Sequence, residues 1–132
     1  MAGQDSYGSL AGRVILVTGS TSGMGLRTAQ MLATNGAHVA LCGRRSDEGE
    51  AAAAAIREAG GEASFFVCDV AKEADCVSVV AQTVKKYGRL DGAFNNAGVS
   101  GGDWESTSAD DYNTVLISNI FIFRSRCFLC IF

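Results

Sequence analysis

Three glycines near the start of the chain could hold a phosphate group. They lie in Thr18-Gly19-Ser20-Thr21-Ser22-Gly23-Met24-Gly25, between an apolar run at 14–17 and residues with helical spacing. Such a turn lets the backbone approach a pyrophosphate at a helix N-terminus, where N–H groups and the helix dipole favour anions. Because the spacing is Gly-x-x-x-Gly-x-Gly rather than the commoner Gly-x-Gly-x-x-Gly, the glycines alone also fit a tight turn that binds nothing.

Two arginines follow the second predicted strand, in Cys42-Gly43-Arg44-Arg45. In dinucleotide-binding folds an acidic side chain about 20 residues after the glycines takes the ribose 2′-hydroxyl, whereas an arginine accommodates a 2′-phosphate. No acidic residue occurs here before Asp47. Guanidinium groups offer planar, bidentate donors to phosphate. The pattern favours a phosphate ligand, with a solvated basic turn as the alternative.

Polar residues also follow the third and fourth predicted strands, as Asp69-Val70 and Asn95-Asn96-Ala97-Gly98. A carboxylate at a strand end can accept hydrogen bonds from a ligand or cap the next helix. The two amides and the glycine can order a loop beside a ligand, or they can form a plain turn. The residue types leave both alternatives open at each position.

The elements that would position these residues alternate along the chain. Strands are predicted at 14–18, 38–42, 63–68 and 90–95, with helices at about 24–35, 46–59 and 72–87 between them and a last helix from about Ser108. Ser46 or Asp47 is expected to cap the second helix. The third helix is expected to pack through Val77, Val80, Ala81 and Val84. This alternation predicts one parallel α/β sheet with helices on both faces.

In this order and spacing, the motifs resemble the short-chain dehydrogenase/reductase family over residues 8–119. The resemblance implies a Rossmann-type, doubly wound parallel sheet in which the strands lie in the order third, second, first, fourth. The sheet is expected to be truncated after about four βα units. Family members are NAD(P)(H)-dependent oxidoreductases.

By this resemblance, the glycine turn frames the pyrophosphate, and the Asp69-Val70 pair contacts the adenine. The segment after the fourth strand lies along the adenosine ribose and the central sheet. Arg44 lies one residue after the position where NAD-preferring members carry Asp, so NADP(H) is favoured over NAD(H). The expected cofactor-binding residues are Gly19, Ser22, Gly23, Met24, Gly25, Arg44, Arg45, Asp69, Val70, Asn95, Ala97 and Gly98.

The catalytic residues of the family are mostly absent. Members interconvert a carbonyl and an alcohol with a Ser, a Tyr-x-x-x-Lys pair and a helix Asn. None of Tyr7, Tyr87 and Tyr112 has a lysine four residues later, and the last lysine is Lys86. Asn119 aligns with the helix Asn and is the catalytic candidate, although a buried core amide fits as well. We therefore expect a truncated oxidoreductase without turnover, or alternatively a non-catalytic nucleotide-binding fragment or a product that does not persist as a folded protein.

Composition bounds the remaining possibilities. The net charge of −3 provides no electrostatic footprint for nucleic acid. Residues 1–10 are expected to be flexible and 11–119 to form a partial nucleotide-binding domain, followed by an apolar tail of unrelated texture at 120–132. Arg124 and Arg126 interrupt this tail, which is too short for a membrane span.

The five cysteines and the absence of a secretory signal predict reduced thiols in a cytoplasmic protein. Cys127-x-x-Cys130 would fit a redox or metal pair, but it lacks a second ligand pair, so no metal site is expected. The expected partners are the dinucleotide and, in the full-length family, a small carbonyl or alcohol substrate. Most of the family's oligomer interface is expected to be missing.

Overall fold

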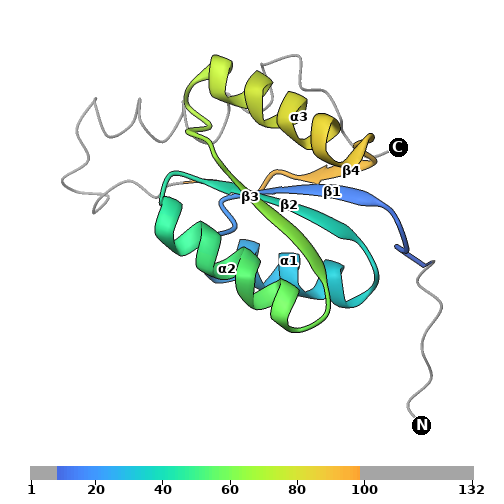
Figure 1. Ribbon diagram of the computed structural model, residues 1–132. Coiled ribbons are helices and arrows are strands. Elements are labelled where there is room, and N and C mark those ends of the chain that lie inside the picture. The colour runs from blue at the N-terminus through green and yellow to red at the C-terminus, as the bar shows by residue number, and fades with distance from the viewer. Residues whose placement is uncertain (1–8, 99–132) are drawn as a thin grey trace, which may run out of the picture.

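The computed structural model describes residues 9–98, which form four strands and three helices (Figure 1). In chain order these are β1 (Val14–Thr18), α1 (Gly23–Thr34), β2 (His38–Gly43), α2 (Ser46–Glu58), β3 (Glu62–Val67), α3 (Glu73–Tyr87) and β4 (Gly92–Phe94). Each strand and helix predicted for this region is confirmed. Only β4 is clearly shorter than predicted: it spans Gly92–Phe94, whereas the expected range is 90–95.

Several predictions fall on residues outside the described range. These are the N-terminal stretch at 1–8, the helix expected to begin near Ser108, the catalytic candidate Asn119 and the tail at 120–132 with Cys127 and Cys130.

The four strands form one parallel sheet in the order β3-β2-β1-β4, as predicted. Val14 is paired with His38 across β1 and β2, and Ile15 is paired with Gly92 across β1 and β4. Consecutive residues of the central strands are buried, which is typical of parallel strands that are covered on both faces. Helices α1 and α2 lie on one face and α3 lies on the other, so the sheet is doubly wound and of Rossmann type (Figure 1).

Small residues allow the helices to approach the sheet closely. On the α1–α2 face, Ala29, Ala33 and Ala53 pack against Val39 and Leu41 of β2. In α2, a Cβ at Gly49 would overlap with the ring of Phe65, so this helix position has space only for glycine.

The predicted apolar face of α3 is displaced by part of a turn. Of the predicted residues, Val80 packs against the core, whereas Val77 is 55% exposed and Val84 is 42% exposed. The buried residues of α3 are instead Cys76, Val79 and Thr83. Cysteine behaves as a small hydrophobic residue, and the Thr83 hydroxyl donates locally to the Val79 carbonyl oxygen at 2.7 Å. A search for aliphatic residues at helical spacing alone therefore identifies the wrong buried face of α3.

The predicted cap of α2 is wrong. Ser46 is the first helical residue, Arg45 occupies the N-cap position, and no side chain caps the helix within the described part of the chain. Asp47 and Glu48 lie in the first turn, where negative charge interacts favourably with the helix dipole. The charge of the first turn thus takes the place of a capping hydrogen bond. Among residues 9–98, no helix is long and apolar enough to cross a membrane.

Candidate functional site

A cleft of about 560 Å³ opens where the strands end, beside the N-terminus of α1. In open α/β sheets, ligands bind at the carboxyl ends of the strands. Most of the predicted binding residues line this cleft, namely Gly19, Ser22, Met24, Arg44, Arg45, Asp69, Val70, Ala97 and Gly98. Gly23, Gly25 and Asn95 do not line it. The sequence interpretation missed four lining residues: Thr21, Gly43, Cys68 and Asn96.

The glycines of the β1–α1 turn are required by close packing. Gly19 has a φ of +62°, and a Cβ there would lie 2.7 Å from the Cα of Ala97. A Cβ at Gly25 would overlap with the Gly19 carbonyl oxygen and lie 2.5 Å from Nδ2 of Asn96. The first and third glycines thus hold the turn against the loop after β4, and this packing shapes one wall of the cleft.

Among residues 9–98, no acidic side chain lies in the first turn of α1 to interact with its N-terminus. Ser22 occupies the N-cap position in an extended conformation, but its side chain makes no capping hydrogen bond. The Leu26 N–H, which donates to the Ser22 carbonyl oxygen at 3.3 Å, is the first amide of α1 with an acceptor inside residues 9–98. The preceding N–H groups and the helix dipole can therefore bind an anion.

The structure separates the two arginines that the sequence places together. Arg45 donates from Nη2 to the hydroxyls of Thr21 and Ser22, at 2.9 and 3.0 Å, and pairs through Nη1 with Glu48 at 2.6 Å. Arg44 is exposed at the cleft, and no side chain within residues 9–98 forms a hydrogen bond or ion pair with it. Arg44 is therefore the arginine whose donors remain open to a ligand.

Asp69 closes a local turn and keeps one oxygen open. Its Oδ1 accepts the Ala71 N–H at 3.1 Å, and its own N–H donates to Oδ2 of Asp75 at 2.9 Å. It does not cap α3, whose N-cap residue is Lys72. Among the described residues no donor reaches Oδ2 of Asp69, so this oxygen can accept a hydrogen bond from a ligand in the cleft.

Asn96, which sequence reasoning did not select, joins the ends of β1 and β4. Its Nδ2 donates to the carbonyl oxygens of Thr18 and Gly19, both at 3.2 Å. The backbone N–H groups of Asn96 and Ala97 both donate to the Thr18 hydroxyl oxygen at 3.0 Å. The adjacent pair Asn95-Asn96 indicates an ordered loop, but only the structure shows which amide faces inward.

Two ionisable groups of the described region are unsuited to acid–base chemistry in this cleft. Hydrogen bonding with Cys42, together with burial, raises the pKa of the Cys68 thiol, which therefore stays protonated. Burial raises the pKa of Tyr87, whose hydroxyl donates to Ser64 at 2.8 Å. Tyr87 ends α3, about 20 Å along that helix from its cleft end. Neither group is therefore a candidate acid or base in the cleft.

Comparison with known proteins agrees with this geometry. A family model described as short chain dehydrogenase matches residues 13–124. The chain is 47% identical over 90 residues to 2,5-dichloro-2,5-cyclohexadiene-1,4-diol dehydrogenase of Sphingobium indicum, covering 68% of this chain and 35% of that protein. The chain thus spans about a third of the length of this relative.

Solved structures of this kind are also similar. NAD+-bound xylitol dehydrogenase has a TM-score of 0.82 and 35% identity, with 89% of this chain and 48% of that chain covered. Actinorhodin polyketide ketoreductase with NADPH has a TM-score of 0.80 and 36% identity, with 86% and 44% covered. The two structures carry different dinucleotides, so the likeness by itself favours neither.

Proposed function

This chain belongs to the short chain dehydrogenase family, and we propose that it forms the NADP(H)-binding half of an oxidoreductase that interconverts a carbonyl and an alcohol. The observation that carries the proposal is the cleft beside α1, where an uncapped helix N-terminus and the exposed Arg44 lie on the same surface. The bound nicotinamide would donate or accept a hydride. The residues of this chain would bind and orient the cofactor.

The donor set fits a dinucleotide that carries a 2′-phosphate. The N–H groups at the start of α1 would receive the pyrophosphate, with Gly19 keeping the loop after β4 close to the turn. Asp69 and Val70 would lie against the adenine, and Arg44 would bind the 2′-phosphate. The preference for NADP(H) over NAD(H) depends on Arg44 and on the absence of an acidic residue between the end of β2 and Asp47.

By itself, the 132-residue chain is proposed to bind the cofactor without turnover. Its sequence contains no Tyr-x-x-x-Lys, and Asn119 is the one family catalytic residue that it is proposed to supply. Loss of a general acid–base typically removes about 10²–10⁴-fold of rate. We propose a small carbonyl or alcohol as the substrate of the whole protein and the cytoplasm as its location.

Calorimetric titration of the chain with NADP+ tests binding, and NADPH consumption with a panel of ketones and aldehydes tests turnover. We expect heat of binding and no consumption above a heat-inactivated control. Absence of binding would overturn the proposed cofactor site. Turnover by the chain would overturn its assignment as a binding half.

A further inference from the structure

Ser22 is a residue type that caps helices well, and it occupies the N-cap position of α1, yet it caps nothing. Serine at this position normally accepts a hydrogen bond from the N–H of the second or third helical residue, here Met24 or Gly25. The Ser22 hydroxyl instead accepts the Nη2 donor of Arg45 at 3.0 Å. A side chain that would close the helix end is therefore held away from it.

Arg45 is itself held in place from two sides. Nη2 also donates to the Thr21 hydroxyl at 2.9 Å, and Nη1 pairs with Glu48 of α2 at 2.6 Å. The guanidinium thus connects the first turn of α2 to the β1–α1 turn. Its planar, fixed set of donors suits such a bridge better than a flexible ammonium group would.

We propose that Arg45 is a positioning residue that keeps Ser22 from capping α1 and so leaves the helix N-terminus open for the pyrophosphate. This inference rests on the proposed dinucleotide function. Without Arg45, the Ser22 hydroxyl turns to the amides of the first turn and competes with the anion. With Arg45 present, the hydroxyl oxygen accepts the guanidinium donor and makes no capping hydrogen bond to the helix.

The alternative is that Arg45 is a direct phosphate ligand like Arg44. The Glu48 carboxylate balances the charge of Arg45, and Arg45→Gln leaves that carboxylate unbalanced, so the informative comparison is between Arg45→Gln and the double variant, which have the same charge. The two roles differ in what a second substitution at Ser22 does. A capping competitor disappears when the hydroxyl is removed, whereas a lost ligand is not restored.

The test compares the parent chain with Arg45→Gln and with Arg45→Gln combined with Ser22→Ala, titrated with NAD+ and NADP+ by calorimetry. We expect Arg45→Gln to weaken both dinucleotides by about fivefold, the equivalent of one N-cap hydrogen bond. The double variant should bind both dinucleotides at least about twofold more tightly than Arg45→Gln, because the competing hydroxyl is gone. An unchanged affinity, a loss confined to NADP+, or a loss that Ser22→Ala does not reverse would overturn the proposal.

Amide hydrogen exchange of the ligand-free chains gives a second reading that does not depend on the cofactor. We expect exchange at Met24 or Gly25 to slow by about fivefold in Arg45→Gln and to recover in the double variant. Glu48→Gln should move exchange in the same direction by a smaller amount, whereas Glu50→Gln, on an exposed position of the same helix, should not.

The binding and exchange measurements distinguish failure of the proposed dinucleotide function from failure of the positioning role of Arg45. If neither dinucleotide binds the parent chain, the proposed function fails, and the exchange comparison alone decides the role of Arg45. If exchange at Met24 and Gly25 is the same in all variants, the positioning role is wrong even where the dinucleotides bind.

Discussion

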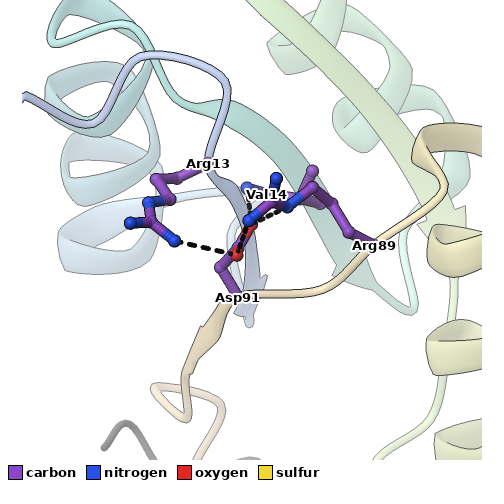
Figure 2. Close-up of polar contacts among 4 residues, drawn as sticks. All are labelled: Arg13, Val14, Arg89 and Asp91. Carbon is purple, nitrogen blue, oxygen red and sulfur yellow. Dashed lines mark hydrogen bonds and ion pairs between the residues drawn. The ribbon is translucent and has the colours of Figure 1, made fainter.

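The Asp91 carboxylate accepts the backbone N–H of Val14, the first residue of β1, at 2.8 Å (Figure 2). Figure 2 shows Asp91 between Arg13 and Arg89, whose guanidinium groups donate to it at 3.3 Å and at 2.6 and 2.8 Å, respectively. This cluster joins β1 to the start of β4 at their amino ends. Asn96 and Thr18 join the same strands at their carboxyl ends, so both ends of the β1–β4 pair are fastened.

Asp91→Asn should reduce the dependence of stability on acid pH. Hydrogen bonds from Arg89, followed by the Val14 N–H, hold the pKa of Asp91 well below its usual range. A carboxyl with a lowered folded-state pKa stabilises the fold above its unfolded pKa of about 3.9, and this contribution is lost as pH falls below that value. Urea unfolding between neutral pH and strongly acidic pH should show a shallower acid decline in the variant. Glu50→Gln serves as the control, and equal declines in the parent chain and Asp91→Asn would contradict the assignment.

Asn96→Ala should destabilise the fold, and Asn95→Ala should not. The first substitution leaves the Thr18 and Gly19 carbonyl oxygens without the Nδ2 donor, which costs about 1–2 kcal/mol. The second removes an exposed amide outside the cleft lining and should stay within about 0.5 kcal/mol. Chemical denaturation measures both. A larger loss for Asn95→Ala would show that the two amides have been assigned the wrong way round.

Gly25→Ala should cost more stability than Gly23→Ala. A Cβ at Gly25 meets the Gly19 backbone, which cannot move aside cheaply, so we expect a loss of about 3 kcal/mol. Gly23 has a φ of +59°, but the space that an added methyl group would occupy is open, so only backbone strain of about 1 kcal/mol is expected. Thermal or urea unfolding of both variants checks the order, which would be reversed if the strain at Gly23 dominated.

Features that depend on spacing along the chain could be predicted from the sequence. The strands, the glycine turn and the cleft-lining positions Asp69 and Val70 follow from a repeating pattern of strands, turns and helices, and the strand order follows from the family that this pattern resembles. The roles of Arg44 and Arg45 could not be separated in this way, because they depend on which guanidinium reaches Glu48 and the β1–α1 turn.

The side chains that the sequence interpretation misjudged share a physical cause. Asn95 and Asn96 are the same residue type in neighbouring positions, and only the path of the backbone after β4 decides which amide reaches β1. Cys76 and Thr83 are buried in α3, but neither is aliphatic, so a search for aliphatic spacing does not register them. Asn96 is distinguished by its contact with Thr18, which is distant in the sequence. The Thr83 hydroxyl is satisfied by the backbone of its own helix.

The cofactor preference of the chain, measured before and after Arg44→Asp, tests the proposed NADP(H) site most directly. Loss of a charge-assisted hydrogen bond costs about 1.5–3 kcal/mol, so the parent chain should bind NADP+ more tightly than NAD+ by roughly tenfold or more. Arg44→Asp should reverse the preference, while Lys85→Asp on the exposed surface of α3 should leave it unchanged. Equal affinities for the two dinucleotides in the parent chain, or a ratio that Arg44→Asp does not alter, would contradict the proposed site.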